Sequence, residues 1–332
     1  MDTTSKISRE KQQLLEMTDA QVRQVLRLAK QGQRVQRATG TAAPAKPAAR
    51  QQTGLAQMEA LIGLDSAKAM VYKMLAFQKL NREAVRRGKP SALESNHMAF
   101  LGNPGTAKTT FARILARIFY EQGLLPKDNL VEVGRSELCG EYVGSTAIRT
   151  KEAVKRALGG VLFVDEAYSL VSTCEKDYGR EAIDTLVQEM ENHRQDLVVV
   201  LAGYPREMEN LLQSNAGLRS RVPWVLHFAD YTRPQLCAIA EKMAADTGYS
   251  LTPAAVEKIG DICNRMMGDK DFGGGRFVRN LMQEGRYNKA LALESTNLKT
   301  LSDQVLFQLD ADLFVQPEGL RREEKTTLGF AT

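Results

Sequence analysis

The sequence predicts an α/β protein: a parallel five-stranded P-loop sheet sandwiched by helices, followed by a small all-α lid domain and preceded by a helical N-terminal extension. Short apolar runs alternate with helical stretches between residues 97 and 228, as in sheets whose strands are buried on both faces. From Thr232 onward the pattern is helical alone. The predicted strands are His97–Leu101, Leu130–Val133, Val161–Val164, Leu197–Ala202 and Val225–Phe228.

A phosphate-binding loop follows the first predicted strand and precedes an amphipathic helix, which is the context that a P-loop requires. Free N–H groups at a helix N-terminus form an anion site. Lys108 would reach the β- and γ-phosphates of ATP, and the Thr109 hydroxyl would complete the Mg²⁺ shell. After Gly102, the predicted nucleotide-binding residues of this loop are Asn103, Pro104, Gly105, Thr106, Ala107, Lys108, Thr109 and Thr110.

Ala107 departs from the P-loop pattern, which has glycine just before the lysine. Glycine serves where the backbone approaches a ligand closely or takes a positive φ. A methyl group costs little there if residue 107 has helical φ and ψ. Two interpretations stay open: a working nucleotide site, and a site that binds nucleotide but turns it over poorly.

Two acidic residues, Asp165 and Glu166, end the apolar run Val161–Val164. Ligands of parallel sheets gather at the carboxyl ends of the strands. Asp165 is therefore expected to hold Mg²⁺, because hard cations prefer carboxylate oxygen. Glu166 would orient and deprotonate an attacking water molecule. Together with the P-loop, this pair predicts hydrolysis of ATP, beyond mere binding.

Pattern breaks divide the chain into five expected regions. Residues 1–37 are predicted to form amphipathic helices, and residues 38–54 an Ala/Pro linker. The expected α/β domain spans residues 55–230 and the helical lid domain residues 231–300. Residues 301–332 are a C-terminal tail with no informative pattern.

Composition excludes several classes of protein. The net charge is +5, and residues 1–53 alone carry ten Lys/Arg against four Asp/Glu, so the remaining body is near neutral and a nucleic-acid surface is not expected. The four cysteines have no CxxC spacing and the three histidines are isolated. No apolar run is long enough to span a membrane, and no signal peptide is visible. We therefore expect a cytoplasmic protein.

The region from about Leu55 to about Leu293 resembles AAA+ ATPases of the group that contains red-type rubisco activase (CbbX) and stage V sporulation protein K. The 54 residues before it lie outside the resemblance. The motifs that carry it are the P-loop and the segments Leu61–Asp65, Glu141–Thr146, Gly159–Tyr168, Ala202–Tyr204 and Gly217–Arg221.

The resemblance implies roles for two further segments. Ile62 and Gly63 would contact adenine; the alternative is a packing turn at a helix start. Tyr142, Val143 and Gly144 match the loop that lines the central pore in this superfamily, where an exposed aromatic ring grips a polypeptide. The alternative is a buried loop tyrosine.

The resemblance also implies arginines that sense the γ-phosphate. Arg221, supported by Arg219, would be the arginine finger acting on the neighbouring subunit, which requires an oligomer, by analogy a hexameric ring. Either arginine could instead form a structural salt bridge. Arg276 resembles the sensor 2 residue, whereas Arg279 is expected to be structural. The usual polar sensor 1 residue is replaced around Gly203–Pro205, so none is assigned.

These features predict an ATP-driven ring that remodels a protein substrate by partly threading it through a central pore. A nucleotide-dependent scaffold or switch with slow hydrolysis is the alternative, motivated by Ala107. A DNA-directed AAA+ protein is a weaker third. The substrate cannot be derived, and nothing outside the motor motifs points to rubisco. The N-terminal helices are where recruitment of a partner is expected.

Overall fold

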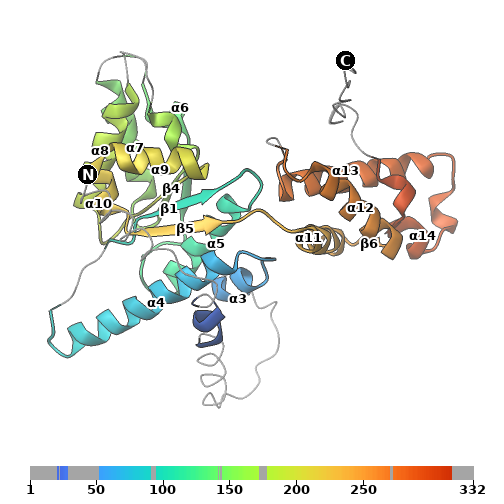
Figure 1. Cartoon of the computed structure of the whole chain (residues 1–332), viewed down its shortest axis with the longest axis horizontal. Helices are drawn as coiled ribbons and strands as arrows, with labels where there is room; N and C mark the ends of the chain where they lie inside the picture. Colours follow the sequence, from blue (N-terminus) through green and yellow to red (C-terminus); the bar gives the residue numbers. More distant parts are fainter. Residues whose placement is uncertain are drawn as a thin grey trace, which may run out of the picture. The chain divides into compact units, whose positions relative to one another are not determined.

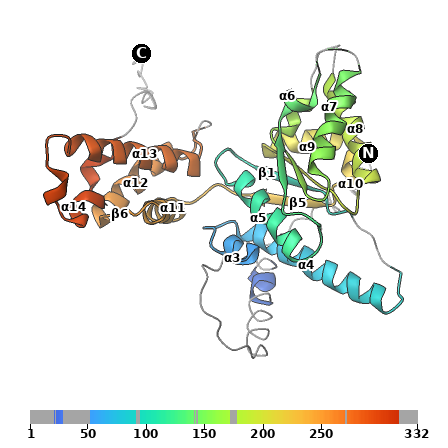
Figure 2. The same ribbon diagram turned by 180° about the vertical axis from the view of Figure 1, so that it is seen from behind.

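The structure is a computed structural model that describes residues 21, 23–28, 52–90, 95–140, 142, 144–171, 178–269 and 272–315 (Figures 1 and 2). It divides into two compact units, Met1–Asp230 and Tyr231–Thr332. Of the predicted linker only residues 52–54 are described, and its last residue, Gly54, already begins a helix (Gly54–Glu59) that Thr53 caps. Most of the N-terminal helices, Val143 and the last residues of the tail lie outside the described residues. Residues 23–28 are helical.

The first unit is built on a five-stranded parallel sheet with the strand order β2-β3-β4-β1-β5. The apolar runs of the sequence are these strands, within one residue at each end, so the predicted α/β class is confirmed. The buried strands are β1 (Met98–Gly102), β3 (Val161–Val164) and β4 (Val198–Gly203), and the edge strands are β2 (Leu130–Val133) and β5 (Trp224–Phe228).

Alternate residues of each strand face opposite layers of helices, because side chains in a strand have a period of two. Ala99, Leu101, Leu162 and Val164 belong to the core on one face. The helices of that core, with the short helix η1, are α6 (Arg135–Leu138), α7 (Ser145–Ala157), η1 (Ala167–Leu170), α8 (Tyr178–Asn192), α9 (Pro205–Ser214) and α10 (Ala216–Arg221).

The opposite face carries an aromatic cluster. The ring of Phe100 contacts Phe111 of the helix after the P-loop, Phe163 and Phe228, at centroid distances of 4.8–6.3 Å. The pairs with Phe111 and Phe163 are edge-to-face and the pair with Phe228 is tilted. Edge-to-face packing stabilises a core beyond area burial alone. The helices on this face are α3 (Gly54–Glu59), α4 (Asp65–Arg86) and α5 (Lys108–Glu121) (Figure 1).

The second unit is mainly helical. Thr232 and Thr252 cap helices that begin with proline in their first turn, a strong helix-start signal. The helices are α11 (Arg233–Asp246), α12 (Pro253–Met266), α13 (Gly275–Ala292), η2 (Leu298–Thr300), α14 (Asp303–Phe307) and η3 (Ala311–Leu313).

The expected boundary at residue 300 is corrected by the structure. Strand β7 (Gln308–Leu309) pairs in parallel with β6 (Ser250–Leu251), so the lid unit is not purely helical. Phe314 is 1% exposed and packs on Gly285, where an added Cβ would lie 2.5 Å from its ring. Residues up to about 314 therefore belong to this unit, held by long-range contacts that no local pattern reveals.

Among the described residues, no helix is both long and apolar enough to cross a membrane.

Candidate nucleotide site

The P-loop and the acidic pair lie at one edge of the sheet. β4 separates β1 from β3, with Leu101 paired to Gly203 and Val164 paired to Leu201. Because all strands are parallel, the residues that follow them emerge at the same edge. The structure therefore brings together the two motifs that the sequence predicted to act together, with the end of β4 between them.

The P-loop turns through two left-handed residues, Gly105 with φ 73° and Ala107 with φ 65°. The Thr106 hydroxyl, which is buried, donates to the Asn103 carbonyl at 2.8 Å and closes the turn. Gly102 allows close approach to β5, since a Cβ there would lie 2.6 Å from Phe228. Thr109 and Thr110 follow in the first turn of α5.

Ala107 does not have the right-handed helical φ and ψ with which its methyl group would cause little strain. Residue 107 precedes α5 in the left-handed conformation, not in the right-handed helical one. A left-handed alanine carries about 1 kcal/mol of strain that glycine would avoid. The methyl group is accommodated, and the loop keeps the turn that a P-loop needs.

Lys108 folds over the loop, where its Nζ donates to the carbonyl oxygens of Gly102 and Asn103 at 2.8 Å each. The side-chain amide of Asn103 in turn donates to Asp230 Oδ2 at 2.8 Å, which ties the P-loop to the chain leaving β5. Asp230 is a contact that sequence reasoning missed, because it pairs across 127 residues.

Asp165 and Glu166 are exposed at the end of β3. Asp165 Oδ1 accepts the Glu166 N–H at 3.0 Å, and Glu166 itself has a φ of 47°. This left-handed turn breaks the strand at the point where the two carboxylates are needed. Both carboxylates line a cavity of about 590 Å³, together with Gly134, Arg135, Ser136, Cys139 and Ser169.

The residues present fit Mg²⁺ held in the way typical of phosphate-transfer sites. The described residues contain no cluster of three or more His, Cys, Asp or Glu that would bind a metal by itself. Mg²⁺ commonly takes one or two protein ligands and completes its shell with water and substrate phosphates. The exposed carboxylate of Asp165 and the hydroxyl of Thr109 are donors of the right type.

Arg135 was not predicted as a site residue. It lies at the end of β2, beside the acidic pair, and its guanidinium donates to the Ser169 carbonyl. The available signal was its position, because every residue that follows a strand of a parallel sheet emerges at the same edge.

The position after β4, where a polar sensor 1 residue is usual, is occupied by the aromatic residue Tyr204. Tyr204 packs against Tyr168 with ring centroids 5.6 Å apart, and Gly203 leaves room for Tyr168, since a Cβ there would lie 2.6 Å from Cδ1 of that ring. Burial, reinforced by the Glu166 carboxylate, raises the pKa of Tyr168 to about 12. The tyrosine hydroxyl thus stays neutral beside the acidic pair.

Ile62 and Gly63 lie in the turn between α3 and α4, where Gly63 has a φ of 65°. The turn is stiffened by Lys68, which is 5% exposed and donates to the Leu61 carbonyl at 2.6 Å. The adenine role and the packing turn both remain compatible with this arrangement.

Tyr142 is 74% exposed, so the alternative of a buried loop tyrosine is wrong. The base of its loop is fixed: Ser145 Oγ donates to the Tyr142 carbonyl at 2.6 Å, and the Gly140 N–H donates to buried Thr146 at 3.0 Å. Gly144 takes a φ of 81°. Hydrogen bonds at the base of the loop thus accompany an exposed ring.

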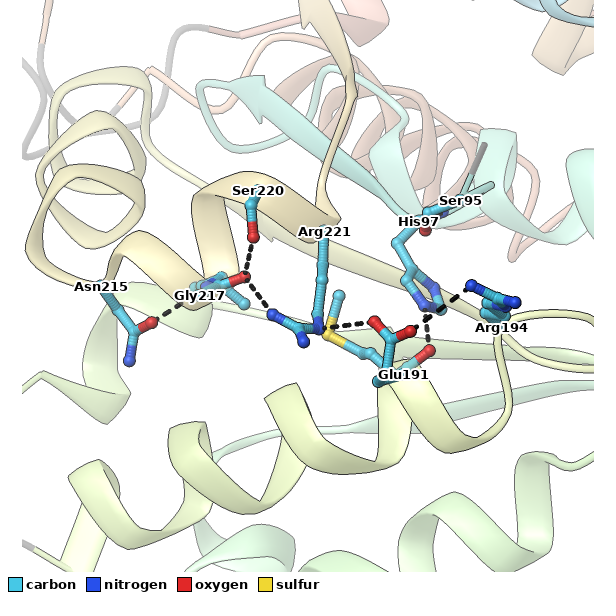
Figure 3. Close-up of polar contacts among 10 residues, drawn as sticks. Ser95, His97, Glu191, Arg194, Asn215, Gly217, Ser220 and Arg221 are labelled. Carbon is cyan, nitrogen blue, oxygen red and sulfur yellow. Dashed lines mark hydrogen bonds and ion pairs between the residues drawn. The ribbon is translucent and has the colours of Figure 1, made fainter. Parts of the chain in front are cut away.

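The two predicted finger arginines lie at the end of α10, and the structure gives Arg221 an ion pair within the chain. Its Nε lies 3.1 Å from Glu191 Oε2 (Figure 3). Arg219 is more exposed. Arg276 lies in the first turn of α13, in the second unit. The roles of these arginines remain predictions.

Family models match both units: the ATPase family associated with various cellular activities (AAA) over residues 98–227, and an AAA lid domain over residues 232–321. Stage V sporulation protein K of Bacillus subtilis is 40% identical over 240 residues, covering 71% of this chain and 74% of that protein. Protein CbbX of Cereibacter sphaeroides is 41% identical over 247 residues, covering 74% and 80%.

The fold also matches the FIGL-1 AAA domain in complex with ADP, with a TM-score of 0.51, 19% identity and coverage of 77% of this chain and 80% of that one. The chain belongs to the AAA family of ATPases, in the group of CbbX and stage V sporulation protein K. It is an ATP-binding ATP hydrolase, as the P-loop and acidic pair predicted.

Proposed function

We propose that this ATPase works as a ring, by analogy a hexamer, that uses ATP hydrolysis to remodel or partly thread a protein substrate through its central pore. The observation that carries the proposal is the exposed Tyr142 on a loop whose base is closed by hydrogen bonds. An aromatic ring on a fixed platform can grip side chains of many kinds without reading their sequence.

Hydrolysis would take place at the strand edge that carries Lys108 and Glu166. Glu166 takes a proton from a water molecule, the water oxygen bonds to the γ-phosphorus, and the bond from that phosphorus to the β–γ bridging oxygen breaks. ADP and phosphate are the products. Mg²⁺ held by Thr109 and Asp165 would neutralise charge on the phosphate oxygens.

The remaining predicted residues would link this chemistry to the ring. Arg221 of the neighbouring protomer, supported by Arg219, would stabilise the charge of the transition state. Arg276 would contact phosphate and couple the lid to the nucleotide state, and Ile62 with Gly63 would hold adenine. These assignments rest on motif positions and on the geometry of the strand edge.

The pore role is tested with an unfolded probe, carboxymethylated α-lactalbumin carrying a fluorescent label. Glu166→Gln protein, which is expected to bind ATP without hydrolysing it, should capture the probe in the presence of ATP. Adding Tyr142→Ala should weaken capture about tenfold, whereas Tyr142→Phe should preserve it, because the ring supplies the grip. Fluorescence anisotropy gives the Kd. Equal capture by the alanine variant would contradict the pore role.

The substrate is proposed only as a protein, since the relatives carry names from different processes. The N-terminal helices would recruit it, because they lie outside the motor. Deleting residues 1–53 should leave the basal ATPase rate unchanged; retention of every partner by that variant would remove the recruitment role.

An ATP-dependent scaffold with slow hydrolysis is the second candidate. It is favoured by the strain at Ala107, on the loop that must hold the phosphates. In this case the ring would assemble on ATP and use hydrolysis as a timer.

A further inference from the structure

The guanidinium of Arg221 is held on two sides within its own chain. Nε donates to Glu191 Oε2 at 3.1 Å, and Nη1 donates to the Gly217 carbonyl at 3.2 Å (Figure 3). The side chain is 29% exposed. Nη2 donates no hydrogen bond to any of the described residues. The planar fork of arginine is rigid, so fixing two of its nitrogens also fixes where the third one points.

Glu191 is itself anchored to the sheet through the preceding residue. The Met190 carbonyl accepts from Nε2–H of His97 at 3.0 Å, while His97 Nδ1 accepts the Val199 N–H at 3.0 Å. His97 is completely buried and immediately precedes β1. These two bonds define the tautomer of the ring and fasten the end of α8 to β1 and β4.

The pair between Glu191 and Arg221 adds little to folding stability. The Glu191 side chain is 50% exposed, and its other oxygen lies 3.5 Å from Arg194. Ion pairs this accessible to water contribute little, because solvent screens them. The contact instead orients the long, flexible side chain of Arg221. Without it, the conformational freedom of that side chain would have to be lost when the transition state forms.

We propose that Glu191 is a positioning residue that orients Arg221, so that its Nη2 end is presented to the nucleotide of the neighbouring protomer. This inference rests on the proposed arginine finger. It assigns a function to an acidic residue that no motif marks, 30 positions before the arginine.

The test measures steady-state ATPase kinetics of the assembled ring. Glu191→Ala should lower kcat about tenfold with little change in KM for ATP, because the lost orientation matters only in the transition state. Glu191→Gln, whose amide oxygen still accepts from Nε, should restore at least half of the rate. Glu189→Ala is the matched control on α8: Glu189 lies beside His193, not Arg221, and the rate should not change.

A double-mutant cycle tests whether Glu191 affects kcat through Arg221. In an Arg221→Ala background, Glu191→Ala should change kcat by less than twofold, because the residue acts through Arg221. An equal loss in both backgrounds would overturn the inference, as would parental or faster turnover by Glu191→Ala, or a glutamine variant as impaired as alanine. Those outcomes leave the finger itself intact if Arg221→Ala alone lowers kcat about 10³-fold, to a residual rate that is still measured. Full activity of Arg221→Ala would instead remove the finger and this inference together.

Discussion

At the scale of single residues, the P-loop of this chain has alanine, at position 107, where the left-handed backbone favours glycine. Gly105 and Ala107 both have positive φ, but only glycine takes that conformation without strain. The loop holds its shape through Thr106 and through the bond from Asn103 to Asp230. The backbone strain at Ala107 therefore lowers the free energy of unfolding, which can be measured.

Ala107→Gly should raise the free energy of unfolding by up to about 1 kcal/mol, because the left-handed strain that it removes from the folded state outweighs the extra backbone freedom that glycine gives the unfolded chain. Trp224, the single tryptophan of the chain, is buried in β5 and reports unfolding of the first unit by fluorescence in urea. Gly105→Ala is the matched control and should lose a comparable amount. An unchanged midpoint in both variants would contradict the strain argument.

At the scale of elements, the hydrogen bonds that connect α8 with β1 and β4 require His97 to be neutral. Burial lowers the pKa of His97 to about 4; the hydrogen bond to the Met190 carbonyl and the Glu191 charge raise it by less, and the Arg221 charge lowers it slightly further. The unfolded chain binds this proton at the ordinary pKa of 6.5, so between pH 6.5 and pH 4 the unfolded state holds more protons than the folded state. Stability therefore falls as the pH is lowered through this window.

Between pH 7.5 and pH 5, this group should remove about 2 kcal/mol from the free energy of unfolding of the first unit. His97→Gln should be less stable at neutral pH but should show a smaller loss over the same range. Urea titrations followed by Trp224 fluorescence measure both proteins. An identical pH dependence in parent and variant would exclude His97 as the titrating group.

The elements also show what the sequence could predict. Each core strand is a continuous apolar run, so burial on both faces marks its bounds to within a residue. The acidic pair and the P-loop are local patterns, and their meeting at one edge follows from parallel strands. The pairing of Arg221 with Glu191 forms only when α10 packs on α8. Residues 308–314 likewise join the second unit through contacts with residues far away in the sequence. Such contacts have no local signal.

At the scale of the whole molecule, the proposed ring depends on how the ATP site and the arginine finger are arranged in the chain. The phosphate loop and the acidic pair share one sheet edge, whereas Arg221 lies at the end of α10 and is oriented by a bond to α8. An arginine finger acting between subunits makes turnover depend on assembly. This dependence separates a motor ring from a monomeric ATPase and from a scaffold that hydrolyses slowly.

The most direct test is the steady-state ATPase rate per protomer across a range of protein concentrations, for the parent and for Arg221→Ala, with size followed by light scattering. We predict a rate that rises as rings form in the parent and falls by about 10³-fold or more in the variant. ATP-dependent assembly with negligible turnover would indicate the scaffold. A rate independent of concentration and of Arg221 would contradict the account.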